Sequence, residues 1–576
     1  MDEGFWYSIP AHLQESIVVG SIVRVPLSGR KVRGHVVELA GDRAAKLKDI
    51  AALSSQMPVF DRDLLKTLRW AATHYVAPLA VILDHASPPN LPSLPKTEDG
   101  EVVSPTANPG HPLFGIAEGV VRNRRRPATA LIGRWQGLDW LGSLTPLLSR
   151  ELSTLVVTGT EAEAVAIAAS ARARGLPVVL AAGEVSRDLT DSWARAQLPG
   201  RLVVGTPRVA SWKISGLVLV IVLEEGRRAM KDRQTPTIHV RELMVTRSRI
   251  EGFSLVFFGP TPSVEVLAGG AEVIRDGIRA WPLVEIVDRR DDPPGTGFLA
   301  DRTVAALRSH TSEGRRSFVF THRRSSDSSM RCVRCRRVRI CADCGSRLGR
   351  EEVCRRCGRP SGPCEHCGGT SFEEMGSEPE RLAAEIERRL GGGSAGLNPT
   401  DRPVIVGTER DLAALGPVPL VVAVDVDGLM LGHNYRTSEE ALRILARVAN
   451  VVETGSGRRM MAQTSLPDAP LLVTLRRGDP VPYLEGVLGE RVGLGFPPAT
   501  EMLAVEIRGE VDPAGFDADL RALGGGSVLG PAPGGQGWRW LLQGSLGPLK
   551  LELRPLVQRW RDSGATVRVD ADPIDL

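Results

Sequence analysis

Short apolar runs recur along the middle of the chain, and polar, amphipathic or glycine-rich segments separate them. Apolar runs bounded by turn residues are typical of strands that are buried on both faces of a parallel sheet. Helical patterns lie between these runs, so the order of elements predicts an α/β protein. The predicted strands cover residues 155–157, 178–180, 202–204, 217–223, 255–258, 318–320, 404–406 and 420–424.

Two segments show the predicted helices most clearly. Residues 161–174 and 378–390 carry Ala, Glu, Arg and Leu at helical spacing, and each precedes a glycine, which favours a helix end. Near the N-terminus, apolar and polar residues alternate over residues 21–37 around a Val-Pro pair and Gly29, as in a compact β-barrel or hairpin. The proline-rich residues 88–109 are interpreted as a linker.

Length and charge narrow the class of protein. A chain of 576 residues is several times the size of one core and should divide into about three to five domains. No run of apolar residues is long enough for a transmembrane helix, and the N-terminus lacks a basic leader with an apolar run. We therefore expect a cytoplasmic protein with no membrane partner.

The net charge of +4 does not by itself indicate a nucleic-acid partner. Arginines do gather at positions 122–126 and again between Arg315 and Arg359. A solvated surface explains such a cluster as well as a nucleic-acid contact does, so the charge alone leaves both interpretations open.

The cysteines give the sharpest chemical signal. All eight lie in four consecutive C-x-x-C pairs: Cys332/Cys335, Cys341/Cys344, Cys354/Cys357 and Cys364/Cys367. In a cytosolic protein such pairs indicate metal sites, because the thiols stay reduced and zinc takes four ligands in a tetrahedron. Isolated buried thiols or a redox pair would not place every cysteine at this spacing. Eight thiolates predict two structural zinc ions per chain, each with four cysteine ligands.

Loop lengths suggest how the pairs combine. Five residues separate the first pair from the second, whereas nine separate the second from the third. This difference favours a nested arrangement; a cross-braced one, in which the first pair joins the third, is the alternative. The nested arrangement assigns Cys332, Cys335, Cys364 and Cys367 to zinc 1, and Cys341, Cys344, Cys354 and Cys357 to zinc 2.

Several motifs in order around the cysteines resemble the bacterial replication-restart PriA family over nearly the whole chain. Singly each motif is a weak turn or strand signal, but their common order makes coincidence improbable. The motifs are Gly205–Arg208 (GTPR), Phe258–Ser263 (FGPTPS), Ser317–Arg324 (SFVFTHRR), Gly407–Glu409 (GTE), Asp425–Gly428 (DVDG), Gly495–Pro498 (GFPP), Gly530–Pro533 (GPAP) and Val569–Pro573 (VDADP).

The resemblance also covers the start of the chain, where Phe5, Tyr7 and Pro10 match a family segment that belongs to a domain binding the 3′ end of DNA. The resemblance implies that Phe5, Gly29 and Lys48 line the pocket that binds the DNA end, with the aromatic ring stacking on a base and the lysine holding phosphate. Trp6 stands where the family has aspartate. The resemblance further implies DNA contacts by Lys231 and Arg241 in a coupling loop, for which a solvated loop is the alternative.

The sequence departs from the family where ATP would bind. A phosphate-binding loop needs Gly-Lys followed by Ser or Thr, and the sequence contains no Gly-Lys pair. At that place the chain has residues 131–137, LIGRWQG, which are bulky. The magnesium-binding motif reads Leu223-Glu224-Glu225, with leucine in place of the aspartate, and residues 447–454, RVANVVET, lack the arginines of the family's last motif. We therefore expect a degenerate ATP site that takes up neither ATP nor magnesium.

The resemblance implies two helicase-type RecA-like lobes with an inserted two-zinc module, a small β-rich N-terminal domain and a C-terminal α+β domain. The expected function is binding of abandoned or stalled forks and of single-stranded DNA, with primosome assembly that reloads the replicative helicase, and without ATPase activity. The alternative is an active ATP-dependent 3′–5′ helicase of the same family. The expected domains are residues 1–90 (3′-end binding), 91–128 (linker or shortened winged helix), 129–290 (lobe 1), 291–330 with 371–478 (lobe 2), 331–370 (zinc module) and 479–576 (C-terminal domain).

Overall fold

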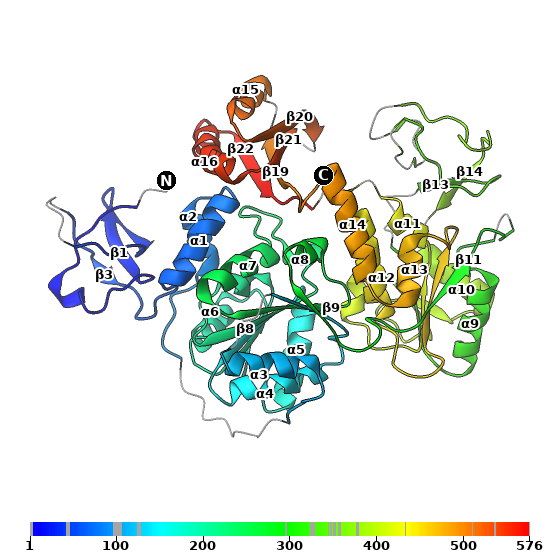
Figure 1. Ribbon diagram of the computed structural model, residues 1–576, viewed down its shortest axis with the longest axis horizontal. Coiled ribbons are helices and arrows are strands. Elements are labelled where there is room, and N and C mark those ends of the chain that lie inside the picture. The colour runs from blue at the N-terminus through cyan, green and yellow to red at the C-terminus, as the bar shows by residue number, and fades with distance from the viewer. Residues whose placement is uncertain are drawn as a thin grey trace.

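In the computed structural model, the described residues form five sheets. The two largest sheets belong to two lobes, and the other three belong to smaller bodies beside and above the lobes (Figure 1). The described residues are 4–41, 47–95, 106–123, 128–293, 296–322, 329–343, 345, 348–349, 353–354, 359–375, 379–432, 434–509, 511–534 and 537–574. Among them, no helix combines the length and the apolar character that crossing a membrane requires.

The N-terminal domain begins with a three-stranded antiparallel sheet of β1 (Ile22–Leu27), β2 (Arg30–His35) and β3 (Ala52–Leu53). Ser28 and Gly29 form the two-residue turn between β1 and β2, and both have positive φ, as a tight hairpin of this length requires. The predicted hairpin is thus confirmed. Helices α1 (Arg62–His74) and α2 (Leu79–Ala86) follow and bury their apolar sides in the core that lobe 1 forms.

Lobe 1 contains a seven-stranded parallel sheet in the order β10-β4-β9-β8-β5-β7-β6. Helices lie on its faces, as expected when crossovers connect parallel strands (Figure 1). Its strands are β4 (Thr129–Ile132), β5 (Ser153–Val157), β6 (Val178–Ala181), β7 (Leu202–Gly205), β8 (Leu217–Leu223), β9 (Ser254–Gly259) and β10 (Glu272–Arg275). Its helices are α3 (Pro112–Val121), α4 (Thr145–Leu148), α5 (Glu161–Ala173), α6 (Ser186–Arg195), α7 (Val240–Glu251) and α8 (Val264–Ala268).

Lobe 2 has a six-stranded parallel sheet in the order β11-β18-β17-β12-β16-β15. Its strands are β11 (Val284–Asp288), β12 (Ser317–Phe320), β15 (Ala395–Leu397), β16 (Val404–Gly407), β17 (Leu420–Ala423) and β18 (Arg459–Thr464). Its helices are α9 (Asp301–Ser312), α10 (Pro379–Leu390), α11 (Val426–Met430), α12 (Thr437–Ala449), α13 (Pro470–Arg477) and α14 (Val481–Leu494). All eight predicted strands and both predicted helices of the two lobes are present.

The predicted borders of lobe 2 need correction. Strand β11 pairs with β18, so lobe 2 begins before residue 291, where the sequence placed its start. At the other end, Leu484 and Val487 of α14 are buried in the lobe 2 core although the sequence placed them in the C-terminal domain.

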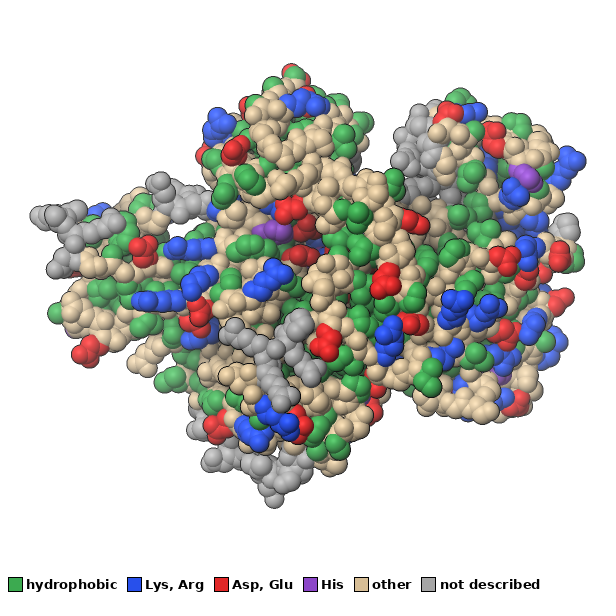
Figure 2. All heavy atoms as spheres, in the orientation of Figure 1, with side chains coloured by type: hydrophobic (Ala, Val, Ile, Leu, Met, Phe, Trp, Pro, Cys, Tyr) green, Lys and Arg blue, Asp and Glu red, His purple; other side chains and the backbone are tan. Residues whose placement is uncertain are grey.

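Two smaller bodies stand above the lobes, with an open notch between them (Figures 1 and 2). The cysteine-rich module lies over lobe 2 and contains the antiparallel pair β13 (Ser329–Cys332) and β14 (Phe372–Met375). The C-terminal domain has a four-stranded sheet in the order β20-β21-β19-β22, with two helices. Its elements are β19 (Glu501–Arg508), α15 (Ala514–Ala522), β20 (Gly526–Gly534), β21 (Gly537–Gly544), α16 (Gly547–Asp562) and β22 (Thr566–Ala571).

Candidate functional site

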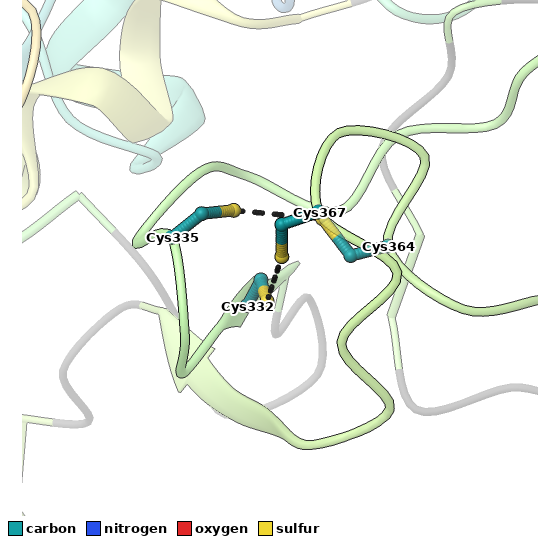
Figure 3. Close-up of side chains that lie close together, drawn as sticks. All are labelled: Cys332, Cys335, Cys364 and Cys367. Atoms are coloured by element: carbon teal, nitrogen blue, oxygen red, sulfur yellow. Dashed lines mark hydrogen bonds between the residues drawn. The ribbon is translucent and has the colours of Figure 1, made fainter.

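Four cysteines from the two ends of the inserted module meet at one point. The sulfur atoms of Cys332, Cys335, Cys364 and Cys367 all lie within 4.8 Å of one another, and Figure 3 shows their side chains converging. Cys332 Sγ lies 3.5 Å from Cys367 Sγ, and Cys335 Sγ lies 3.6 Å from Cys364 Sγ. This is the group that the nested arrangement assigns to zinc 1.

The same turn shapes both cysteine pairs. The Cys332 N–H donates to Arg337 O and the Arg336 N–H donates to Cys332 O; the Cys364 N–H donates to Gly369 O and the Gly368 N–H donates to Cys364 O. The residue that follows the second cysteine of each pair is left-handed, with φ of 60° at Arg336 and 69° at Gly368. The turn therefore brings the two sulfurs of each C-x-x-C pair to the same side.

The donor set fits a tetrahedral metal ion. Four sulfurs at the usual zinc–sulfur distance would lie about 3.8 Å apart, close to the two spacings above. Burial acts to raise the pKa of Cys364, but the His366 and Cys367 backbone N–H groups outweigh it and lower that pKa to about 7, whereas burial raises the pKa of Cys335 to about 12. Thiolates this close repel one another unless a cation lies between them. The cluster can therefore bind a metal such as zinc.

The other four cysteines are described only in part. Cys341 and Cys354 are buried in one small cluster with Leu348, and the Gly345 N–H donates to Cys341 O as in the first pair's turn. Cys344 and Cys357, the other two residues of the predicted zinc 2 site, lie outside the described residues.

The predicted DNA-end residues lie on the surface of the N-terminal domain. Phe5 is 56% exposed, and Gly29 and Lys48 are also exposed. The Ser8 N–H donates to Lys48 O, and the Tyr7 hydroxyl donates to Pro26 O, so the Phe5 segment runs beside Lys48 and is tied to the hairpin that carries Gly29. The segments that carry the three positions are therefore tied to one another, and the three residues themselves are exposed.

The interface between the two lobes, called the cleft below, holds the segments in which the sequence departs from an ATP site. After β4, Trp135 is buried and its indole Nε1–H donates to Glu224 Oε1 at 2.7 Å. Glu224 follows β8, and its other oxygen, Oε2, lies 2.5 Å from Nε of Arg447 on α12 of lobe 2. The carboxylate that follows β8 is thus bound by an indole and a guanidinium of the protein itself.

Arg447 belongs to a larger buried network of ion pairs. Its Nη1 lies 2.6 Å from Glu409 Oε1, and its Nη2 lies 3.6 Å from Glu163 Oε1. Arg227 Nη1 donates to both oxygens of Glu163, at 2.7 and 2.8 Å. Burial would raise the pKa of Glu409, but Arg443 and Arg447 lower it to about 2, so this carboxylate is ionised. Because these partners come from both lobes, sequence periodicity gave no signal for the network.

Two residues expected to contact DNA are buried in ion pairs instead. Lys231 is 7% exposed, and its Nζ lies 2.6 Å from Asp570 Oδ1 of the C-terminal domain. Arg241 is 3% exposed, and its Nη1 lies 3.5 Å from both Glu225 Oε2 and Glu265 Oε2. Lys231 thus joins lobe 1 to the C-terminal domain, whereas Arg241 pairs within lobe 1. Neither offers the exposed charge that a phosphate contact needs.

Glu225 gives the cleft region a pH dependence. Complete burial, with the nearby Glu439 and Glu265 charges, raises the pKa of Glu225 to about 7 despite Arg241 and the Ser263 N–H. The folded state therefore binds more protons than the unfolded state between about pH 4.3 and 7, so stability falls as pH rises through this range.

We expect Glu225→Gln to remove this contribution, because the amide stays neutral and its oxygen can still accept the Ser263 N–H bond. Urea unfolding at pH 5 and pH 8 should show the variant gaining stability relative to the unmodified chain at the higher pH. Equal differences at both pH values would contradict the expectation. Glu161→Gln, at an exposed carboxylate on α5, is the control.

Comparisons with known proteins agree with the geometry. Residues 1–88 match the 3′DNA-binding domain (3′BD) model of PriA. The probable replication restart protein PriA of Mycobacterium tuberculosis is 26% identical over 559 residues, which cover 88% of this chain and 85% of the relative. That of Deinococcus radiodurans is 27% identical over 458 residues, covering 69% of this chain and 49% of the relative.

Among solved structures, a DEAD box protein of Methanococcus jannaschii is 11% identical, with a TM-score of 0.31, and the match covers 64% of this chain and 90% of that protein. This similarity is too weak to support an inference. The matched N-terminal domain, the similarity along most of the chain and the ordered motifs lead to one assignment. The chain belongs to the family of the replication restart protein PriA.

Proposed function

We propose that this protein binds abandoned or stalled replication forks and helps assemble the primosome that reloads the replicative helicase, without hydrolysing ATP. The observation that carries the proposal is the N-terminal domain, which matches the 3′DNA-binding domain and exposes Phe5, Gly29 and Lys48 together. An exposed aromatic ring stacks on a base without regard to sequence, and a lysine holds the phosphate backbone. These two contacts suit an arrested nascent strand end, whose sequence varies.

The module over lobe 2 is proposed to hold two zinc ions. The first uses the four converging cysteines, and the second uses Cys341, Cys344, Cys354 and Cys357. A site closed by four thiolates has no open position for a substrate, so zinc would fold the module and not take part in chemistry. The folded module would then offer a surface to DNA or to a primosome protein.

The interlobe cleft supports the absence of ATP hydrolysis. A transferring phosphate needs free cations and a carboxylate that positions magnesium or water. Here Arg227 and Arg447 are paired with carboxylates, and Glu224 is held by Trp135 and Arg447. Loss of one catalytic arginine alone costs about a thousandfold in rate, and the phosphate-binding lysine and the magnesium aspartate are lost as well.

Binding to forked DNA that has a free 3′ end, compared with blunt duplex DNA, tests the proposal, with ATP hydrolysis followed in the same samples. We expect preference for the fork and no DNA-stimulated hydrolysis. Lys48→Ala should weaken fork binding and reduce the slope of log affinity against log salt concentration by about one, the value of one phosphate contact. Phe5→Ala should cost about 1–3 kcal/mol of binding free energy.

Lys66→Ala is the matched control, because Lys66 is an exposed lysine of the same domain that pairs with Asp63 at the surface. Equal affinity for fork and duplex would overturn the proposed fork recognition. DNA-stimulated hydrolysis would instead favour the active 3′–5′ helicase.

A further inference from the structure

The two lobes contact each other through buried charges on both sides of the cleft, in addition to the chain that links them. We propose that these contacts lock the lobes in one closed arrangement without any nucleotide, so that the pair acts as a rigid spacer between the N-terminal domain and the cysteine-rich module. The inference does not depend on the proposed recognition of forks.

Arg447 is the central residue of the lock. It extends from α12 of lobe 2, is 5% exposed, and pairs with Glu224 and Glu163, which are both in lobe 1. Its third partner, Glu409, belongs to lobe 2 and also binds Arg443 at 3.0 Å. Opening the cleft would remove from Glu224 its nearer guanidinium, leaving it Arg227 Nε at 3.8 Å, and would leave Arg447 with one carboxylate. Buried charges that lose a close partner are strongly unfavourable.

Arg134 closes the cleft from the opposite direction. It stands in the segment after β4, and its Nη2 donates to the carbonyl oxygens of Asn450 and Val452 in lobe 2, at 2.8 Å each. These carbonyls follow the C-terminal end of α12, where a positive charge is favoured by the helix dipole. A residue at the position of a phosphate-binding loop thus binds the other lobe.

A second group of contacts lies around α8. Glu265 of α8 pairs with Arg436 of lobe 2 at 2.7 Å, and the Val264 N–H donates to Glu439 of lobe 2 at 3.1 Å. All three side chains of these ion contacts are largely buried. Val264 and Ile132 also belong to the apolar cluster that forms the core of lobe 2. The lobes are therefore joined by apolar packing as well as by charge, and a hinge motion would have to break both.

The test measures the distance between the lobes in the full-length zinc-loaded protein. Labels introduced by non-cysteine chemistry at Val165 of α5 and Arg388 of α10, both exposed, leave the cysteine-rich module intact. We expect one narrow distance distribution that is the same with and without millimolar ATP and magnesium. A change in the distance on addition of ATP and magnesium would overturn the inference.

Hydrogen exchange on the same protein gives the second measurement. Arg447→Met should broaden the distance distribution and raise exchange at residues 131–137 by about tenfold or more. Arg290→Met, which removes an exposed ion pair within lobe 2, should change neither. If Arg447→Met fails to fold, Arg134→Met replaces it, because it removes two hydrogen bonds and leaves no carboxylate unpaired.

A narrow distribution that persists in both Arg447→Met and Arg134→Met would also overturn the inference, since these side chains would then not hold the lobes. Fork binding is measured in parallel with each variant. An ATP-dependent interlobe distance, or a narrow distribution in both variants, with fork preference retained would refute only this inference. Failure of the unmodified chain to prefer forks, with a narrow interlobe distance that ATP does not change, would refute only the proposed function.

Discussion

Replacing Cys332 with serine is expected to lower the bound zinc from two ions per chain to one. Cys332 is fully buried at the end of β13, and its sulfur is one of four that converge. A hydroxyl is a poor substitute for a thiolate at a zinc ion, and three remaining ligands leave the site open. Structural zinc sites contribute about 10–16 kcal/mol to the folding of small modules, so loss of the ion should unfold the module locally.

Elemental analysis of the purified protein measures the change directly, and protease sensitivity between β13 and β14 reports the local unfolding. Arg334→Ser is the matched control, because it puts the same residue into the same turn. It removes an exposed side chain whose hydrogen bond among the described residues is to Cys367 O at 3.3 Å. If Cys332→Ser retained the zinc content of the unmodified chain, the assignment of this site would be wrong.

Replacing Lys231 with methionine is expected to loosen the C-terminal domain from lobe 1. The Lys231 ammonium lies 2.6 Å from Asp570 and donates to the carbonyl oxygens of Ala571 and Asp572, also at 2.6 Å. Methionine fills a similar volume but removes the ammonium donor from these oxygens in a buried place. Breaking one side of such a pair costs about 3–5 kcal/mol.

Hydrogen exchange of the β22 amides measures the free energy of this local opening. The control is Lys66→Met, which breaks a pair whose side chains are 67% and 55% exposed, and it should cost about 0–1 kcal/mol. Weaker DNA binding by Lys231→Met with unchanged exchange in β22 would contradict the structural role and favour the DNA contact that the family resemblance implies.

The lobes could be predicted largely from local patterns. Runs such as 217–223 and 420–424 are apolar throughout, because both faces of a parallel strand are covered, and a run of this kind is visible without knowledge of its partners. Strand β18 was missed because Arg459 and Gln463 interrupt its apolar residues. Strand β20 of the C-terminal sheet was missed because it is rich in glycine and proline.

The sequence also predicted one candidate site, the metal centre, and missed the contacts of the other, the cleft. The spacing of the cysteines indicated a metal centre, and the loop lengths favoured the grouping that the structure shows for Cys332, Cys335, Cys364 and Cys367. The cleft was different. The sequence showed that the residues of an ATP site are absent, but it did not show that Arg447 and Trp135 bind Glu224 in its place.

The sequence alone therefore determined eight buried strands and two helices of the lobes, the presence of a cysteine-rich module and the resemblance to the PriA family. The tertiary structure decided which charges are exposed. Lys231 and Ala571 lie 340 residues apart, and Arg447 lies in the other lobe from Glu224. A local pattern reports whether a residue's neighbours in the chain are buried, but the partner of a buried charge is fixed only when distant segments pack together.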